Sequence, residues 1–196
     1  MIKIPLPAGG TPAGKSIHLI RHGQSVFKAA FDSLTRVDPM IFDAPLSEIG
    51  VGQARALQSE VHALGVQLIV TSPLTRAIQT TLHAFGPDHA PIRVECLHRE
   101  RLEHSGDVGR SPRALRSDFP GLAFDHLDDP WWHCDRANPQ GILVESEETL
   151  LGRVRHFRDW LRARPETTIA VIGHGTFLNR LTGHQFRNCE RLTLSL

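Results

Sequence analysis

The sequence predicts a three-layer α/β sandwich with a mostly parallel central sheet, and three observations support this fold class. Short apolar runs alternate with longer amphipathic runs, as in folds whose parallel strands are joined by helices. A chain of 196 residues suits one domain with a substantial core. The stretch at about 98–141 is rich in proline and has no sustained period, and long structureless loops are rare in compact domains. We therefore expect a single domain, residues 1–196, with a small folded cap inserted at about 98–141.

The first half of the chain predicts three strands, at residues 16–20, 67–73 and 92–97. A helix is expected over 45–65, where apolar residues recur at helical spacing and Ser47 can serve as the N-cap. Ser72 is expected to cap the following helix, with Pro73 at its first position.

The second half predicts a long helix, a strand, a short helix and a final edge strand, at residues 145–164, 167–175, 176–181 and 191–196. On the long helix, Val154, Phe157 and Leu161 share one face, which is typical of a helix that packs on a sheet. The strand at 167–175 runs into a glycine-rich turn.

Charge and cysteine content exclude several classes of protein. A formal net charge of +1 and a pI of about 7.9 give no domain-wide basic field, so we expect no nucleic-acid partner. No run is long and apolar enough to cross a membrane, and the N-terminus lacks the apolar core of a signal peptide. Cys96, Cys134 and Cys189 suggest neither a disulfide framework nor a CxxC metal site. We expect a cytoplasmic protein with free thiols, for which a homodimer is possible.

Residues Gly9–Ser16 match the P-loop pattern G-x-x-x-x-G-K-[ST]. A working P-loop joins a strand to a helix whose N-terminus holds phosphate. Here Ser16 leads into a strand, and Pro5 and Pro7 make the preceding segment a poor central strand. We interpret the match as a leader before the first strand.

Three short motifs follow predicted strands, at the edge of a parallel sheet where ligands bind. These motifs are Arg21-His22-Gly23, Ser72-Pro73-Leu74-Thr75-Arg76 and Gly173-His174-Gly175-Thr176. Arginines bind phosphate oxygens in a bidentate way, and helix N-termini favour negative charge. Together the motifs predict a pocket for a phosphate dianion.

At these residues the chain resembles the histidine phosphatase superfamily, also called the phosphoglycerate mutase-like family. The matching stretches lie in the family's order between Ile17 and Leu178: "LIRHGQS", "PLSEIGVGQARAL", "TSPLTRAIQTT", "HRERLEHSGDVGR", "ESEETLLGRV" and "VIGHGTFL". The resemblance implies an α/β sandwich with a small cap, and phosphoryl transfer through a phosphohistidine without a metal or other cofactor.

Carried over by position, the resemblance implies that His22 is the nucleophile, that Arg21 and Arg76 hold the phosphoryl oxygens, and that His174 is the second pocket histidine. Glu100 matches the family's proton donor, although Glu103 and Asp107 are close enough to be alternatives. Five further residues are expected to adjoin the substrate: Gly23, Gln24, Ser25, Gly175 and Thr176.

The chemistry agrees with these roles. A neutral imidazole can attack phosphorus at neutral pH, and a backbone carbonyl accepting from its other nitrogen would fix its orientation. Cationic groups stabilise the charge on the phosphoryl oxygens, and a carboxylic acid protonates the leaving oxygen. The patterns C-x₅-R, D-x-D, H-x-H and H-E-x-x-H are absent, which disfavours cysteine, aspartyl-phosphate and two common metal-dependent designs.

The resemblance leaves the reaction open between a phosphatase acting on a small phosphorylated metabolite and a phosphomutase. Phe27 and Lys28 stand where mutases typically have Trp and Asn, which favours the phosphatase. A catalytically idle regulator that binds a phosphorylated ligand is a third alternative. The cap would select the substrate. Trp131 and Trp132 are expected to anchor the cap on the core, the alternative being that they stack on a ring or peptide of the substrate. Arg110 and Arg113 are expected either to bind a second anionic group of the substrate or to lie in solvent.

Overall fold

A five-stranded sheet forms the centre of the protein. The computed structural model describes residues 14–31, 34–35, 37–134, 137 and 141–196. Within these residues the strand order is β3-β2-β4-β1-β5, and the strands are β1 (Ser16–Arg21), β2 (Leu68–Thr71), β3 (Ile92–Val94), β4 (Thr168–Gly173) and β5 (Arg191–Ser195). Only β5 pairs antiparallel, with β1. The mostly parallel sheet is confirmed.

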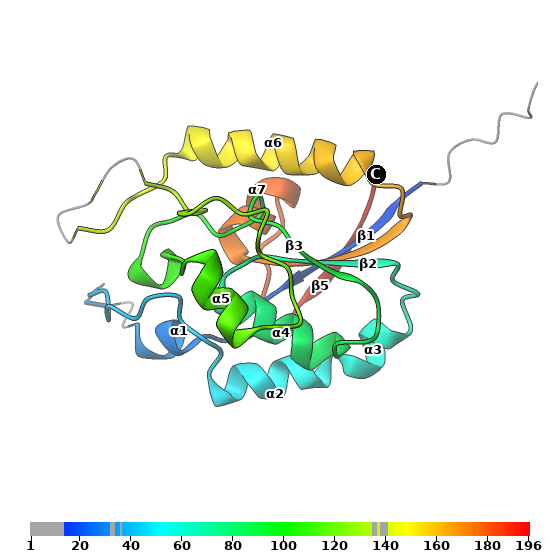
Figure 1. Ribbon diagram of the computed structural model, residues 1–196, viewed down its shortest axis with the longest axis horizontal. Helices are drawn as coiled ribbons and strands as arrows, with labels where there is room; N and C mark the ends of the chain where they lie inside the picture. The colour runs from blue at the N-terminus through cyan, green and yellow to red at the C-terminus, as the bar shows by residue number, and fades with distance from the viewer. Residues whose placement is uncertain (1–13, 32–33, 36, 135–136, 138–140) are drawn as a thin grey trace, which may run out of the picture.

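Helices cover both faces of the sheet (Figure 1). One face carries α6 (Glu147–Ala163) and α7 (Gly175–Thr182), and the other carries α2 (Glu48–Ala56), α3 (Gln58–His62) and α4 (Thr75–Phe85). Successive strand side chains point to opposite faces, so Ile17 and Leu19 pack under α6 and α7, whereas Ile20 and Ile69 pack towards α3 and α4. The three-layer sandwich is therefore confirmed.

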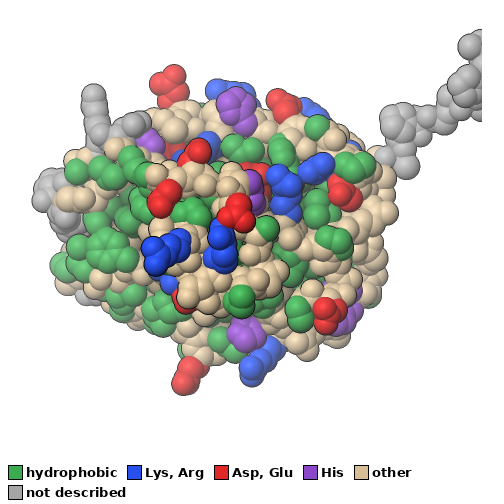
Figure 2. All heavy atoms as spheres, viewed as in Figure 1, with side chains coloured by type: hydrophobic (Ala, Val, Ile, Leu, Met, Phe, Trp, Pro, Cys, Tyr) green, Lys and Arg blue, Asp and Glu red, His purple; other side chains and the backbone are tan. Residues whose placement is uncertain are grey.

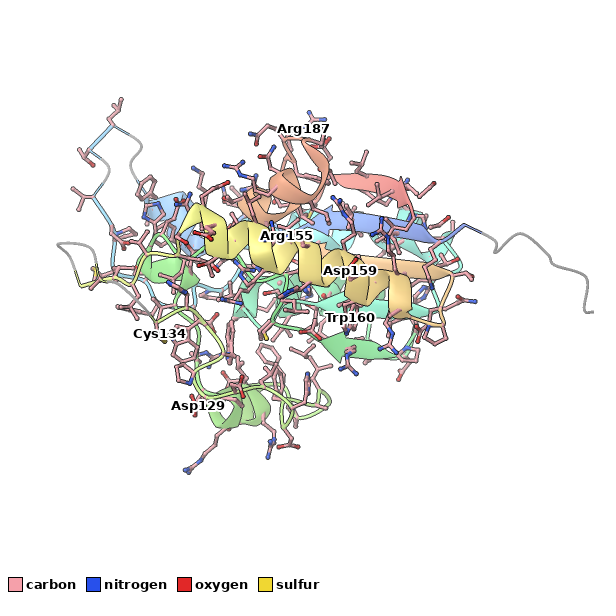
Figure 3. The ribbon with its side chains drawn as sticks, turned by 90° about the horizontal axis from the view of Figure 1, so that it is seen from above. Asp129, Cys134, Arg155, Asp159, Trp160 and Arg187 are labelled. Atoms are coloured by element: carbon pink, nitrogen blue, oxygen red, sulfur yellow. The ribbon has the colours of Figure 1, made fainter. Side chains whose placement is uncertain are left out.

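The long helix α6 follows the predicted pattern. Val154, Phe157 and Leu161 are buried against the sheet. Seen from above, α6 crosses the molecule with Arg155 and Asp159 on its outer side (Figure 3).

Several predicted boundaries are wrong. The helix expected over 45–65 is divided at Leu57 into α2 and α3, although Ser47 does cap α2 by accepting a hydrogen bond from the Gly50 amide (3.1 Å). The helix after β2 starts at Thr75 rather than Pro73, and Ser72 does not cap it. Instead the Thr75 amide donates to the Asp43 carboxylate (2.8 Å). A cap supplied by a distant loop leaves no local sequence signal.

The segment predicted to form a cap contains the 3₁₀ helix η1 (Ser105–Asp107), helix α5 (Pro112–Asp118) and irregular chain. Trp131 is buried in an apolar cluster that joins α5 to α4, and its Nε1 donates to the Arg110 carbonyl (2.8 Å). The anchoring interpretation of Trp131 is thus confirmed. The Arg110 guanidinium pairs with Asp43 (2.7 Å) and Asp118 (2.6 Å), so it serves neither of the two expected purposes.

Most of the P-loop match lies outside the described residues. Of its described part, Ser16 opens β1, and the Lys15 ammonium donates to the Glu166 carbonyl (2.8 Å). These residues therefore lie at the start of β1, at the other end of the strand from His22.

The strand ends bring the three motifs together. Arg21 is opposite Gly173 in the register of β1 and β4, and Thr71 is opposite Ile172 in that of β2 and β4. The residues that follow each strand therefore leave the sheet at one edge.

Candidate active site

His22 leaves β1 with its backbone held on both sides. Its amide donates to the Gly173 carbonyl (3.0 Å), and its carbonyl accepts from the Asn188 side chain (2.9 Å). Gly23 follows at a point of close packing, where a Cβ atom would lie 2.6 Å from the Gly50 carbonyl oxygen. Glycine is needed there because the backbone of α2 leaves no room for a side chain.

The hydrogen bonds of the His22 ring define its tautomer. Nδ1 lies 2.6 Å from the Gly23 carbonyl oxygen, which can only accept, so Nδ1 carries the proton. Nε2 accepts from the Arg76 Nε–H (3.2 Å) and so holds a lone pair. Burial, together with the charges of Arg76 and Arg21, holds the pKa of His22 well below 6.5. The ring is therefore neutral, with Nε2 available as a nucleophile.

Arg76 lies in the first turn of α4 and is almost fully buried. Besides His22, its guanidinium donates to the Gly106 carbonyl (2.5 Å) and pairs with the Asp107 carboxylate (2.8 Å). These contacts from η1 hold the guanidinium beside His22.

Arg21 and His174, which also belong to the predicted site, have buried nitrogens without hydrogen-bond partners among the described residues. His174 is fully buried, its ring centre 5.0 Å from that of His22. Neither of its nitrogens, nor the Nε of Arg21, has a partner among the described residues. Arg21 Nη1 donates to the Phe186 carbonyl (2.7 Å), while a Cβ at Gly175 would lie 3.2 Å from Arg21 Nε. Unpaired buried polar atoms are costly, and a bound anion would accept hydrogen bonds from Arg21 Nε and from the protonated nitrogen of His174.

His174, like His22, is neutral in this structure. Burial, followed by the charge of Arg76, holds the pKa of His174 well below 6.5. Burial also lowers the pKa of Arg21, because a cation with little solvent around it is disfavoured. A phosphate dianion would offset that cost for Arg21.

Glu100 lies at the N-terminus of α7. Its carboxylate accepts from the amides of Arg101 (2.9 Å), Thr176 (3.0 Å) and Phe177 (3.1 Å) and makes no ion pair with any residue that the structure describes. Burial, with the charge of Asp107, raises its pKa. The other two candidates are paired: Glu103 with Arg101 (3.0 Å) and Asp107 with Arg76. All three acids line the cavity, and Glu100 differs from the other two in making no ion pair with a described residue.

A cavity of about 240 Å³ joins these groups. Its lining includes every predicted catalytic residue except the buried His174, and it also includes Ser25 and Thr176. Gln24 does not line it, because the Gln24 side chain bonds to Ser47 Oγ (2.8 Å). Ser25 Oγ accepts from the Lys28 amide (3.2 Å) and so caps the short helix α1 (Val26–Ala30).

Two buried aspartates that no sequence motif marks support the segments around Arg76. Asp43 caps α4, which carries Arg76, and also accepts from the Thr75 hydroxyl (2.5 Å). Asp38 accepts from the amide (2.8 Å) and hydroxyl (2.5 Å) of Ser105, the first residue of η1. Both lie in irregular chain between α1 and α2, where no periodic pattern marks them.

No cluster of three or more metal-ligating side chains occurs in the part of the chain that the structure describes. Searched over the same residues, none of the helices combines the length and the apolar character that a bilayer span requires. Cys96, Cys134 and Cys189 are free thiols.

Comparisons with known proteins identify the family of this chain. Residues 17–191 match the family profile of the histidine phosphatase superfamily (branch 1). Phosphoglycerate mutase-like protein 2 of Arabidopsis thaliana is 35% identical over 238 residues, covering 90% of this chain and 68% of that protein. Glucosyl-3-phosphoglycerate phosphatase of Mycolicibacterium vanbaalenii is 25% identical, covering 84% and 71%.

Solved structures share the fold. Mycobacterial glucosyl-3-phosphoglycerate phosphatase in complex with VO3 superposes with a TM-score of 0.59 at 22% identity, covering 91% of this chain and 92% of that one. The ecdysone phosphate phosphatase of the silkworm, in complex with tungstate, gives a TM-score of 0.60 at 14% identity, covering 91% and 88%. The match to the family profile along nearly the whole chain shows that this protein belongs to the histidine phosphatase superfamily (branch 1).

Proposed function

We propose that this protein hydrolyses monoesters of small phosphorylated metabolites through a phosphohistidine on His22. Its family and its relatives named as phosphatases support a phosphatase. The covalent route rests on one observation, the hydrogen bond from Arg76 Nε to His22 Nε2 (3.2 Å). Because of this contact, the lone pair of His22 Nε2 and the guanidinium of Arg76 face each other. A phosphoryl group that enters between them can replace the hydrogen bond and contact both.

In the first step, Nε2 of His22 bonds to phosphorus while the ester P–O bond breaks. Glu100 gives its proton to the departing oxygen, so the alcohol leaves neutral. Arg21 and Arg76 stabilise the charge on the phosphoryl oxygens, and His174 donates a hydrogen bond to them. The Gly23 carbonyl holds the Nδ1 proton and stabilises the positive charge that develops on the ring.

In the second step, a water molecule attacks phosphorus and the P–N bond breaks, which releases inorganic phosphate. The Glu100 carboxylate takes a proton from that water, which restores the acid for the next cycle. A mutase would instead return the phosphoryl group to a second hydroxyl. The two reactions are separated by measuring phosphate release against isomer formation.

Charge stabilisation by guanidinium groups does not require a metal ion, so we propose a metal-independent reaction. Hydrolysis of p-nitrophenyl phosphate is expected to continue in EDTA, and quenching in base is expected to trap phosphate on His22. Complete loss of activity in EDTA, restored by a divalent ion, would contradict the mechanism. Phosphate binding without any turnover would favour the idle regulator.

A further inference from the structure

Three aromatic rings line one side of the active-site cavity. Phe27 of α1 and Phe31, which follows it, lie with ring centres 5.5 Å apart and nearly parallel. The His104 ring lies 5.6 Å from Phe27 and 5.2 Å from Phe31. All three rings border the same cavity as His22. We call Phe27, Phe31 and His104 the aromatic wall.

The aromatic wall is attached to the phosphate-binding groups. The Phe27 ring packs on Gly106, where a Cβ atom would lie 2.8 Å from a ring carbon. The carbonyl of Gly106 accepts from Arg76 (2.5 Å). A leaving group that departs from phosphorus held at Arg76 therefore has the base of the wall beside it.

Apart from Arg21 and Glu100 at the phosphoryl position and Lys28 at the wall, the charged side chains that line the cavity are ion-paired. Arg101 pairs with Glu103 (3.0 Å) and Glu147 (3.3 Å), and Asp107 pairs with Arg76. A leaving-group carboxylate that bound Arg101 would have to break these contacts. The hydroxyls of a sugar-like leaving group would have to compete with these ion pairs for the same side chains.

The outer part of the wall is partly exposed to solvent. Phe31 is partly exposed, and over its ring lies the Lys28 ammonium, 5.8 Å from the ring centre. An exposed lysine at this distance interacts weakly and can move aside. Phe42, which follows in the chain, is itself half exposed, and hydrophobic side chains gather on the side of the molecule where α1 lies (Figure 2).

We propose that the cavity selects phosphate monoesters whose leaving alcohol carries an apolar ring next to the ester carbon, in preference to phosphorylated sugars and glycerates. The inference rests on the proposed phosphatase activity, since the wall acts on the group that leaves. The ring lies along Phe31 and His104 while the phosphoryl group lies at His22. Aromatic contacts of this kind, added to the burial of the ring, are expected to give a preference of about 10-fold.

The test compares kcat/KM for benzyl phosphate with kcat/KM for glycerol 3-phosphate. Both leaving groups are primary alkoxides, so they need the general acid to a similar extent. The wild-type protein is expected to prefer benzyl phosphate about 10-fold, and Phe31→Ala is expected to bring the ratio of the two values close to one. Phe42→Ala is the control, because Phe42 is aromatic but borders a different cavity, and it is expected to keep the wild-type ratio.

A wild-type ratio at or below one overturns the inference while leaving the phosphatase activity in place, and so does an unchanged ratio in Phe31→Ala. If neither ester is hydrolysed, the proposed function fails, and the wall is then judged by binding alone. Benzylphosphonate is expected to bind more tightly than methylphosphonate to the wild-type protein, and equal affinities would overturn the inference.

Discussion

The floor of the cavity and the aromatic wall at its mouth are built differently. The floor consists of Arg21, His22, Arg76 and His174, and the last three are 6%, 4% and 0% exposed. Arg21 ends β1, His22 and His174 follow strands β1 and β4, and Arg76 lies in the first turn of α4. The residues of the aromatic wall come from the five-residue helix α1, from its C-cap and from the irregular chain before η1. The His104 side chain is 43% exposed. In the reaction that we propose, the rigid sheet edge carries the chemistry, whereas the connecting segments select the leaving group.

The largest expected effect concerns the centre of the floor. His22→Asn keeps a polar side chain of similar size but removes the phosphoryl acceptor. Turnover is expected to fall by roughly 10⁴-fold or more, and no acid-labile phosphoenzyme is expected to form. Vanadate binding measured on the same variant checks that the floor is still assembled. Phosphate trapped on another residue would place the nucleophile elsewhere.

Glu100 lies where the floor meets the leaving group, so its effect depends on the ester. Glu100→Gln is expected to lower turnover of an alkyl phosphate by about 10²–10⁴-fold. Formation of the phosphoenzyme from p-nitrophenyl phosphate, followed as burst-phase rates, should change far less, because that leaving group needs no proton.

Glu103→Gln is the matched control for this experiment, since Glu103 lines the same cavity but pairs with Arg101. It is expected to behave like the wild type on both esters. The opposite pattern would assign the acid to Glu103, and no effect in either variant would point to Asp107.

Asp43 supports the floor from outside it. Asp43→Asn removes the charge that Arg110 pairs with and weakens the cap on α4. The free energy of unfolding, from urea denaturation, is expected to fall by about 3 kcal/mol, and phosphate affinity is expected to fall with it because Arg76 is less well held.

Asp118→Asn is the control for Asp43, because Asp118 pairs with the same arginine from an exposed position. A loss below about 1 kcal/mol is expected there. Equal losses in the two variants would remove the distinction between a buried support and a surface ion pair.

The smallest expected effect tests whether solvent is excluded from the buried region around His98. His98 is fully buried, and burial lowers its pKa to about 3. Below pH 6.5 the unfolded chain binds a proton that the folded protein excludes, so the free energy of unfolding falls as the pH falls. Between pH 7 and pH 5 this residue alone is expected to cost about 2 kcal/mol.

His98→Phe removes that proton, so its stability should depend less on pH than that of the wild type by about the same 2 kcal/mol. The comparison uses the difference in unfolding free energy between pH 7 and pH 5, which cancels the effect of the substitution on packing. Identical pH dependence in the two proteins would show that His98 is solvated.

The sequence by itself determined the layers of this protein and the meeting of three motifs. Alternating apolar and amphipathic runs encode strands and helix faces, and parallel strands end at one edge of a sheet. His22, Arg76 and His174 could therefore be predicted to converge before any contact was known.

Only the tertiary structure decided the contacts between irregular segments. It directs Gln24 towards Ser47, caps α4 with Asp43 rather than Ser72, and pairs Asp107 and Glu103, but not Glu100, with described arginines. Such contacts join loops that are far apart in the chain, and a loop has no period from which its neighbours can be predicted. The packing of distant elements determines them, which is why the aromatic wall and the different pairing of Glu100, Glu103 and Asp107 could be found only in the folded protein.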